Sequence, residues 1–183
     1  MKDRSIGLIE LSSVAAGFQV ADTMLKAGNV QLVLSRSICS GKYMVLICGD
    51  AAAVRSAVEA GAAAANGCLI DKFHVASVHP DVITALGRSQ PGEPTGALGI
   101  LESFNVATLL LAADAAAKAA NVTLMEIRLA MALGGKAFLT MTGDVGSVQA
   151  AVAAGRQVIS EAGMLVNAVV ISRPHPDVYR EVI

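Results

Sequence analysis

The chain has 183 residues, a formal net charge of −1 and 54% hydrophobic residues, but only 3% aromatic residues and no tryptophan. The near-neutral charge and the lack of a basic run exclude the electrostatic signature of a nucleic-acid or anionic-membrane binder. No apolar run approaches the ~20 residues of a spanning helix, and no secretory signal follows the first residues, so we expect no membrane segment. Three cysteines, an odd number, argue against a disulfide framework and indicate a reducing, cytoplasmic setting.

The first half predicts alternating strands and helices. Short Ile- and Leu-rich segments predict strands over 5–11, 31–38, 43–48 and 68–77, while helical periodicity predicts helices over 13–28, from Gly49-Asp50 onward, and briefly from His79-Pro80. In the first helix, five small or apolar residues share one face at 3.6-residue spacing, which we expect to be buried: Val14, Phe18, Ala21, Leu25 and Gly28. Ser12 or Ser13 suits the N-cap of this helix.

The second half repeats the first. The strand containing Gly7 and Glu10 returns with Gly99 and Glu102, and later segments return with offsets of 92 to 96 positions. The repeat predicts strands over 97–103, 123–131, 136–142 and 164–171, and helices over 105–120 and 144–162. We therefore expect an α+β protein with two tandem ferredoxin-like βαββαβ domains and antiparallel sheets, covering 4–88 and 96–183 and joined by a Pro- and Gly-rich linker over 89–95.

Motifs for the common enzyme chemistries are missing. The sequence contains no P-loop, no Rossmann glycine fingerprint, no zinc-type spacing of histidine and cysteine, and no nucleophile elbow. Gly41-Lys42 is interpreted as a glycine turn with a solvated lysine rather than as part of a nucleotide site. Glu10 and Glu102 are interpreted as polar strand ends held by backbone donors rather than as a catalytic pair. We therefore predict that the protein is not an enzyme.

A set of short motifs in fixed order points to a known family. The second half carries Ala97-Leu98-Gly99-Ile100-Leu101-Glu102, Lys118-Ala119-Ala120-Asn121-Val122, Gly134-Gly135-Lys136, Gly143-Asp144-Val145 and Ser172-Arg173-Pro174-His175, and the first half carries a less complete version. This arrangement resembles the bacterial microcompartment (BMC) shell domain in its tandem form. The resemblance implies a pseudo-hexameric homotrimer, placed with other BMC shell proteins in a microcompartment shell in the cytoplasm.

The resemblance also places a central pore. In tandem members of the family, the loop between the second and third strands of each domain surrounds the central axis. The matching pore residues here are Ile38, Cys39, Ser40, Gly41 and Lys42 in the first half and Gly134, Gly135 and Lys136 in the second half. Because the two halves diverge in this loop, we expect the function of the chain to depend on it.

Within the family, the chain is most similar to tandem shell proteins of propanediol-utilising compartments. These carry a [4Fe–4S] cluster on the three-fold axis, held by one pore-loop cysteine from each subunit, and Cys39 matches that cysteine. The resemblance therefore implies one cluster per trimer, with Cys39 as metal ligand and a non-cysteine ligand on the fourth iron. Ser40 and Gly41 would bind it through backbone N–H groups, and Lys42 would offset its negative charge. Where those relatives have Cys-Pro-Gly-Lys, this chain has Cys-Ser-Gly-Lys and lacks the fixed φ of proline.

The cluster implies one of two roles. The protein either transfers electrons across the shell, with an encapsulated redox enzyme or a cytosolic electron carrier as partner, or delivers clusters. Two alternatives remain open from the sequence. One is a metal-free shell tile whose pore passes small polar metabolites, and the other is a cytosolic ferredoxin-like sensor of a small ligand. Cys48 and Cys68 are interpreted as small hydrophobic residues without a metal role.

Four further residues match the edge at which shell tiles of the family meet. Lys26 and Lys118 match a lysine late in the first helix, and Arg173 and His175 match an Arg-Pro-His motif. The first half has Ser77-Val78-His79-Pro80 in place of that motif, so its edge contacts are expected to be weaker. The alternative interpretation of these side chains is that they are ordinary solvated residues.

Overall fold

The computed structural model describes residues 4–87, 96–130 and 133–180. Contacts divide the chain into two compact units, Met1–Pro80 and Asp81–Ile183. This division places the short helix α3 (Pro80–Gly87) with the second unit, whereas the sequence motifs place the same segment at the end of the first domain. The predicted linker lies outside the described residues.

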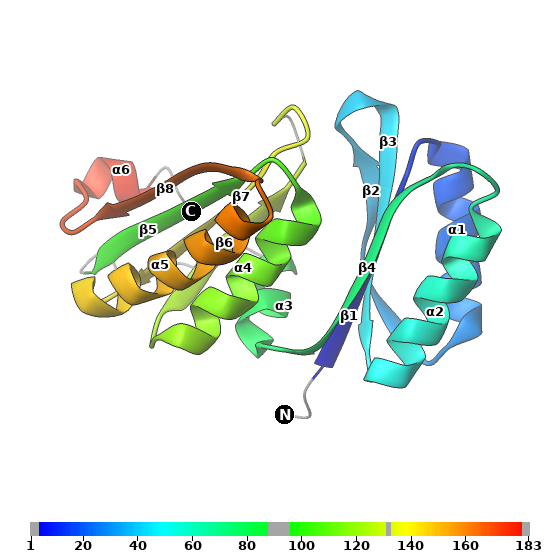
Figure 1. Ribbon diagram of the computed structural model, residues 1–183, viewed down its shortest axis with the longest axis horizontal. Coiled ribbons are helices and arrows are strands. Elements are labelled where there is room, and N and C mark those ends of the chain that lie inside the picture. Colours follow the sequence, from blue (N-terminus) through cyan, green and yellow to red (C-terminus); the bar gives the residue numbers. More distant parts are fainter. Residues whose placement is uncertain (1–3, 88–95, 131–132, 181–183) are drawn as a thin grey trace. The chain divides into compact units, whose positions relative to one another are not determined.

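The first unit is a four-stranded antiparallel sheet covered on one face by two helices (Figure 1). Its elements, in chain order, are β1 (Arg4–Leu11), α1 (Val14–Ala27), β2 (Val30–Ile38), the 3-10 turn η1 (Cys39–Gly41), β3 (Lys42–Gly49), α2 (Ala51–Ala64) and β4 (Leu69–Val78). The strand order is β2-β3-β1-β4. The predicted βαββαβ fold is confirmed for this unit, with β2 and β4 as the edge strands.

Close packing of α1 on the sheet corrects the predicted buried face of that helix. The buried residues of α1 are Gly17, Val20, Ala21 and Met24, whereas Val14, Phe18 and Leu25 are exposed. A Cβ atom on Gly17 would lie 2.1 Å from Cδ1 of Tyr43, so the ring of Tyr43 occupies the space that a side chain would need. The helix therefore turns Gly17, rather than Phe18, toward Tyr43 of β3, and buries Val20 and Met24 on the same side.

The second unit repeats this architecture. Its main elements are β5 (Ala97–Ser103), α4 (Val106–Ala119), β6 (Thr123–Leu129), β7 (Ala137–Gly143), α5 (Val145–Glu161), β8 (Leu165–Ile171) and α6 (Pro176–Arg180). The strand order, β6-β7-β5-β8, corresponds strand for strand to that of the first unit. Ser13 and Asn105 cap the equivalent helices α1 and α4, each accepting a hydrogen bond from the backbone N–H three residues later. The duplication is thus preserved down to the helix caps.

Helix α6 covers part of the sheet face opposite α4 and α5. Tyr179 of α6 is buried with Leu98 and Met125. Its hydroxyl donates a hydrogen bond of 2.7 Å to Oγ1 of Thr142, and the hydroxyl of Thr142 in turn donates to the backbone carbonyl of Ala97. The buried phenol therefore has a hydrogen-bond partner.

Strand β6 ends at Leu129, earlier than predicted. Ala130 has a φ of +49°, which takes the backbone out of the strand conformation. The rest of the predicted strand, residue 131, lies outside the described residues.

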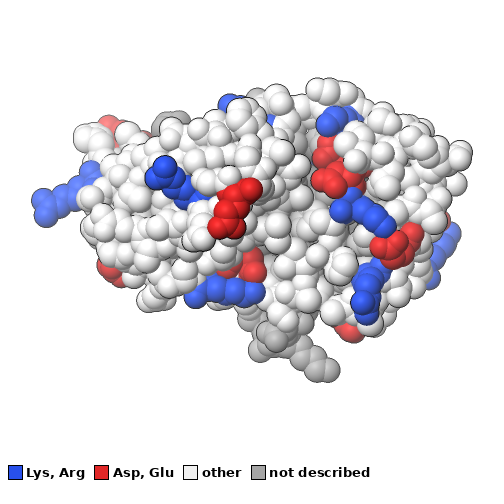
Figure 2. Space-filling model, viewed as in Figure 1, with Lys and Arg blue, Asp and Glu red and all other residues white. Residues whose placement is uncertain are grey.

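No helix among the described residues is long and apolar enough to cross a membrane. On the face shown in Figure 2, the acidic and basic side chains of the described residues lie interspersed, without a large patch of one sign. This distribution agrees with the exclusion of a nucleic-acid-binding surface on that face.

Candidate functional site

The loop that carries Cys39 is a tight hairpin between β2 and β3. Ile38 and Lys42 are register partners, so only three residues, Cys39, Ser40 and Gly41, connect the strands. Ile38 is buried, Cys39 is half-buried, and Ser40 and Gly41 are exposed. A Cβ atom placed on Gly41 would meet nothing within 4 Å, so the tip of the hairpin borders open space. The thiol therefore lies at a projecting turn where copies of the chain could bring their cysteines together.

The backbone of this turn lies in the left-handed region. Ser40 has φ +65° and ψ +26°, and Gly41 has φ +72°. Glycine adopts this conformation without cost, whereas serine is strained by about 1 kcal/mol. Proline, with φ fixed near −65°, could not take the place of Ser40 without reshaping the turn. The turn of this chain thus differs in backbone geometry from a Cys-Pro-Gly-Lys turn.

Two equivalent ion pairs lie next to the two loops. Nζ of Lys42 lies 2.9 Å from Oε1 of Glu10, and Nζ of Lys136 lies 2.8 Å from Oε1 of Glu102. The prediction that backbone donors hold the two glutamates is therefore wrong, because a lysine holds each of them: Lys42 at the start of β3 and Lys136 directly before β7. The side chain of Lys42 is still 39% exposed, but its charge is balanced by Glu10, which weakens its expected role in offsetting an anionic cluster.

The second loop differs from the first in length and in composition. It runs from Ala130 to Lys136, with the backbone N–H of Ala130 donating to the carbonyl of Lys136 and that of Lys136 donating to the carbonyl of Leu133. Gly134 and Gly135 both have positive φ, of +61° and +89°. Residues 131 and 132 lie outside the described residues. This half therefore has Gly134 and Gly135 where the first half has Ser40 and Gly41, and Leu133 precedes them where the first half has Cys39.

An arginine near each loop was missed in the sequence. Arg128 on β6 pairs with Glu126 at 2.6 Å and lies over the ring of Phe138. The equivalent Arg36 on β2 has Leu34 in place of that glutamate, and its buried Nε has no hydrogen-bond partner. Burial lowers the pKa of the Arg36 guanidinium. Aligning the two halves position by position shows that the first half has no glutamate equivalent to Glu126. The burial of Arg36 could not be predicted in this way, because it results from tertiary packing.

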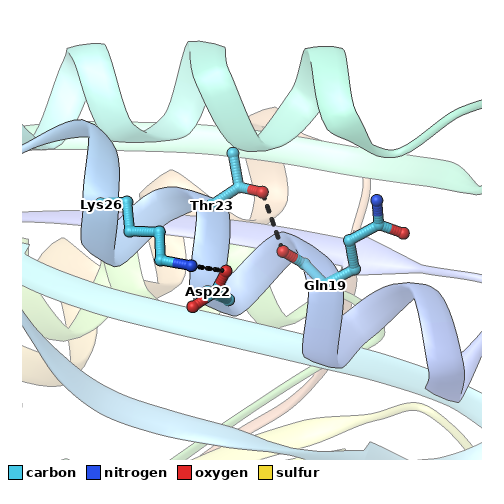
Figure 3. Close-up of polar contacts among 4 residues, drawn as sticks. All are labelled: Gln19, Asp22, Thr23 and Lys26. Carbon is cyan, nitrogen blue, oxygen red and sulfur yellow. Dashed lines mark hydrogen bonds and ion pairs between the residues drawn. The ribbon is translucent and has the colours of Figure 1, made fainter.

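The predicted edge residues lie on the surface. Lys26 pairs with Asp22 one helical turn earlier, and Figure 3 shows this pair beside the hydrogen bond from the hydroxyl of Thr23 to the carbonyl of Gln19. Lys118 forms the equivalent pair with Asp114 at 2.7 Å.

Arg173 is exposed, and His175 is exposed at the start of α6, where its Nδ1 accepts a hydrogen bond from the N–H of Asp177. Lys26 lies on α1, Lys118 on α4, and Arg173 and His175 in the connection between β8 and α6. Contact between tiles through these residues stays a prediction.

A shallow groove of about 450 Å³ in the second unit is lined by residues of α5 and β8, among them Ala153, Arg156 and Ala168. In the first unit the positions of the two alanines are taken by Glu59 and Lys72, which form an ion pair at 2.8 Å. The hydrogen bond from Lys72 lowers the pKa of Glu59. The groove is remote in sequence from both pore loops and shares no residue with them.

Within a single copy, the described residues do not assemble a metal site. No group of three or more His, Cys, Asp or Glu side chains among the described residues is arranged to hold a metal ion. Cys48 is buried and Cys68 packs against the helix-side core of the first unit, as expected of small hydrophobic residues. A thiolate is nevertheless the usual ligand of an iron–sulfur cluster, and Cys39 places a thiol at an open turn. The residues present fit such a cluster if several copies each supply Cys39.

Comparison with known proteins identifies the family. The BMC domain matches the chain twice, at residues 5–78 and 97–174. The chain belongs to the BMC domain family. It is 37% identical to the bacterial microcompartment shell protein PduT of Citrobacter freundii over 98% of both chains. It is also 51% identical, with a TM-score of 0.94 and coverage of 97% and 98%, to a microcompartments protein from Desulfitobacterium hafniense DCB.

A more distant likeness concerns the fold alone. A fused permuted hexameric shell protein from the RMM microcompartment superposes with a TM-score of 0.64 over 87% of this chain and 85% of its own, at 20% identity. The family match and the similarity to PduT make the chain a structural shell protein of a bacterial microcompartment rather than an enzyme. The predicted family and the predicted tandem α+β fold are confirmed.

Proposed function

We propose that this shell protein is a homotrimer that holds one [4Fe–4S] cluster on its three-fold axis through Cys39 of each copy. The observation that carries the proposal is the position of Cys39 at the tip of a three-residue hairpin, half-buried and beside open space. One chain supplies one such thiol, whereas a cluster needs several. A three-fold axis through this turn would multiply the single cysteine to three.

In such a trimer, the residues of the turn have separate roles. Cys39 supplies the thiolate, and the backbone N–H groups of Ser40 and Gly41 would hydrogen-bond the cluster sulfurs. Lys42, engaged by Glu10, holds the base of the hairpin on β1. When bound, a cluster supplies one-electron redox chemistry. The tile would then conduct electrons between an encapsulated redox enzyme and a cytosolic carrier, or deliver clusters, within a shell built with other BMC shell proteins in the cytoplasm.

A second candidate function is a metal-free tile whose axial opening passes small polar metabolites. It is favoured by the exposed, polar Ser40 and Gly41 at the tip of the loop and by the charge of Lys42, which Glu10 already neutralises. In this case Cys39 is a small residue that lines the opening.

Anaerobic purification separates the two functions. The parent protein should absorb broadly at about 400 nm and contain iron and acid-labile sulfide. Cys39→Ser should lose all three signals and remain a trimer, whereas the matched control Cys68→Ser should keep them. Iron that survives Cys39→Ser would refute the assignment of the ligand. A parent protein without iron and sulfide would favour the metal-free tile.

A further inference from the structure

The four strands at the edges of the two sheets differ in charge. Strands β2 and β4 border the first sheet, and β6 and β8 border the second (Figure 1). An edge strand leaves the N–H and C=O groups of every second residue without a strand partner, and charged side chains commonly protect such an edge from further pairing. Three of the four strands carry charges, namely Arg36 on β2, Asp71 and Lys72 on β4, and Glu126 and Arg128 on β6. Strand β8 carries none, so its edge is the one open to another strand.

The shallow groove of the second unit runs beside this same strand. Ala168 and Val170 of β8 line it together with residues of α5, among them Val152, Ala153 and Arg156. We call it the β8 groove. Because Ala168 and Val170 are two positions apart, they share one face of the strand. A strand added to β8 would place every second side chain on that face and therefore in the β8 groove.

The first unit closes the equivalent place with charge. Glu59 of α2 and Lys72 of β4 form an ion pair of 2.8 Å there, and Lys72 also puts a charge on the edge strand. The second unit has Ala153 and Ala168 at these two positions, so it lacks both the ion pair and the edge charge. The two copies of the domain therefore differ in whether this edge is protected.

Arg156 gives the β8 groove a positive charge. Among the described residues, no carboxylate pairs with its guanidinium, and Glu161 of the same helix accepts a hydrogen bond of 2.9 Å from Nε2 of Gln157 instead. The paired N–H groups of a guanidinium match the two oxygens of a carboxylate. Pairing of β8 with β8 of a second copy would bring two Arg156 side chains to one groove, where like charges repel. The charge therefore favours an acidic partner over a second copy of this chain.

We infer that the edge of β8 binds an extended segment of another protein, which adds a fifth strand to the second sheet. The segment presents small apolar side chains and one carboxylate on alternate positions, with the carboxylate at Arg156. In this mode of recognition, main-chain hydrogen bonds supply affinity and the pockets for alternate side chains supply specificity. The β8 groove shares no residue with either pore loop, so the inference does not depend on the proposed cluster.

A designed peptide tests the charge at Arg156. The probe is a capped, fluorescent peptide in which threonine and valine alternate, with glutamate in place of the central valine, and its binding to the full chain is followed by fluorescence anisotropy. Replacing that glutamate by glutamine, or Arg156→Gln in the protein, should each weaken binding by about 5-fold or more. The Arg156→Gln variant should no longer distinguish the two peptides, because the two changes remove the same interaction. The matched control is Arg55→Gln, an exposed arginine on α2 of the first unit, which should bind as the parent does.

Blocking the backbone of the peptide tests strand addition. Two N-methylated versions remove the N–H groups of either the odd or the even positions. Successive N–H groups point to opposite edges of a strand, so one version should lose binding and the other should keep it. If both versions bind alike, or both fail, the peptide does not add to β8 as a strand.

The double variant Ala153→Glu with Ala168→Lys gives the second unit the ion pair of the first. It should abolish binding while circular dichroism shows an unchanged fold. A parent that does not bind the glutamate peptide at about 1 mM, or a double variant that binds it as the parent does, would overturn the inference. Light scattering separates the other occupant: if the double variant has a lower mass than the parent, β8 pairs with a second copy and the acidic partner is refuted.

Discussion

Gly17 and Tyr43 offer a test of how the first domain sets the position of α1. In the second domain the corresponding pair is Leu109 and Ala137, both fully buried. The two domains thus fill the same space with a large residue on the strand in one case and on the helix in the other. Replacing the glycine–tyrosine pair of the first domain by the leucine–alanine pair of the second should show that the effects of the two substitutions on the free energy of unfolding are strongly coupled.

The structure sets the magnitudes. Tyr43→Ala empties the space of a buried ring and breaks its 3.0 Å hydrogen bond with Ser35, at a cost of about 3–5 kcal/mol. Gly17→Leu overpacks, since even its Cβ would lie 2.1 Å from the ring, and should cost about 1–3 kcal/mol after the gain in helix propensity. The double variant recreates the leucine–alanine pair of the second domain. It should recover at least about 2 kcal/mol relative to the sum of the two costs.

Urea unfolding followed by circular dichroism, at one fixed protein concentration, measures all four proteins of this cycle. The reciprocal change, Leu109→Gly with Ala137→Tyr, is the matched control in the second domain. If the two single costs simply add in the double variant, size matching between helix and strand does not position α1, and the reasoning fails.

Two further predictions concern the hairpin that carries Cys39. Ser40→Gly should stabilise the protein slightly, whereas Ser40→Pro should destabilise it by more than about 1 kcal/mol, because Ser40 has a φ of +65°. The midpoints of urea unfolding measure both effects. Equal midpoints for the two variants would contradict the observed turn. Lys42→Met should cost about 1–3 kcal/mol by stranding the mostly buried Glu10 carboxylate, and adding Glu10→Gln should restore most of it. A double variant no more stable than Lys42→Met would show that the ion pair is unimportant.

Much of the fold could be predicted because its signals are local or repeated. Strand and helix periodicity, the caps at Ser13 and Asn105, and the recurrence of the Gly7–Glu10 strand act over a few residues and appear twice. The duplication gave each assignment an internal check. The loop around Cys39 could be placed for the same reason, since it lies between two strands whose counterparts recur in the second half.

Two features could not be predicted from the sequence, the buried face of α1 and the partner of Glu10. Both depend on the sizes and charges of residues that are distant in the sequence. Hydrophobic spacing assigned Phe18 to the buried face of α1, but the ring of Tyr43 needs the space over Gly17 and turns that face outward. Strand register, which brings Lys42 beside Glu10, likewise decided the partner of that carboxylate.

The amino-acid sequence by itself determined two repeated α+β domains, the order of their elements and a single thiol in the first pore loop. Tertiary structure decided which apolar surfaces are covered, because burial depends on what lies opposite each residue in space. That is why Phe18 of α1 is exposed while Leu110, its counterpart on α4, is buried.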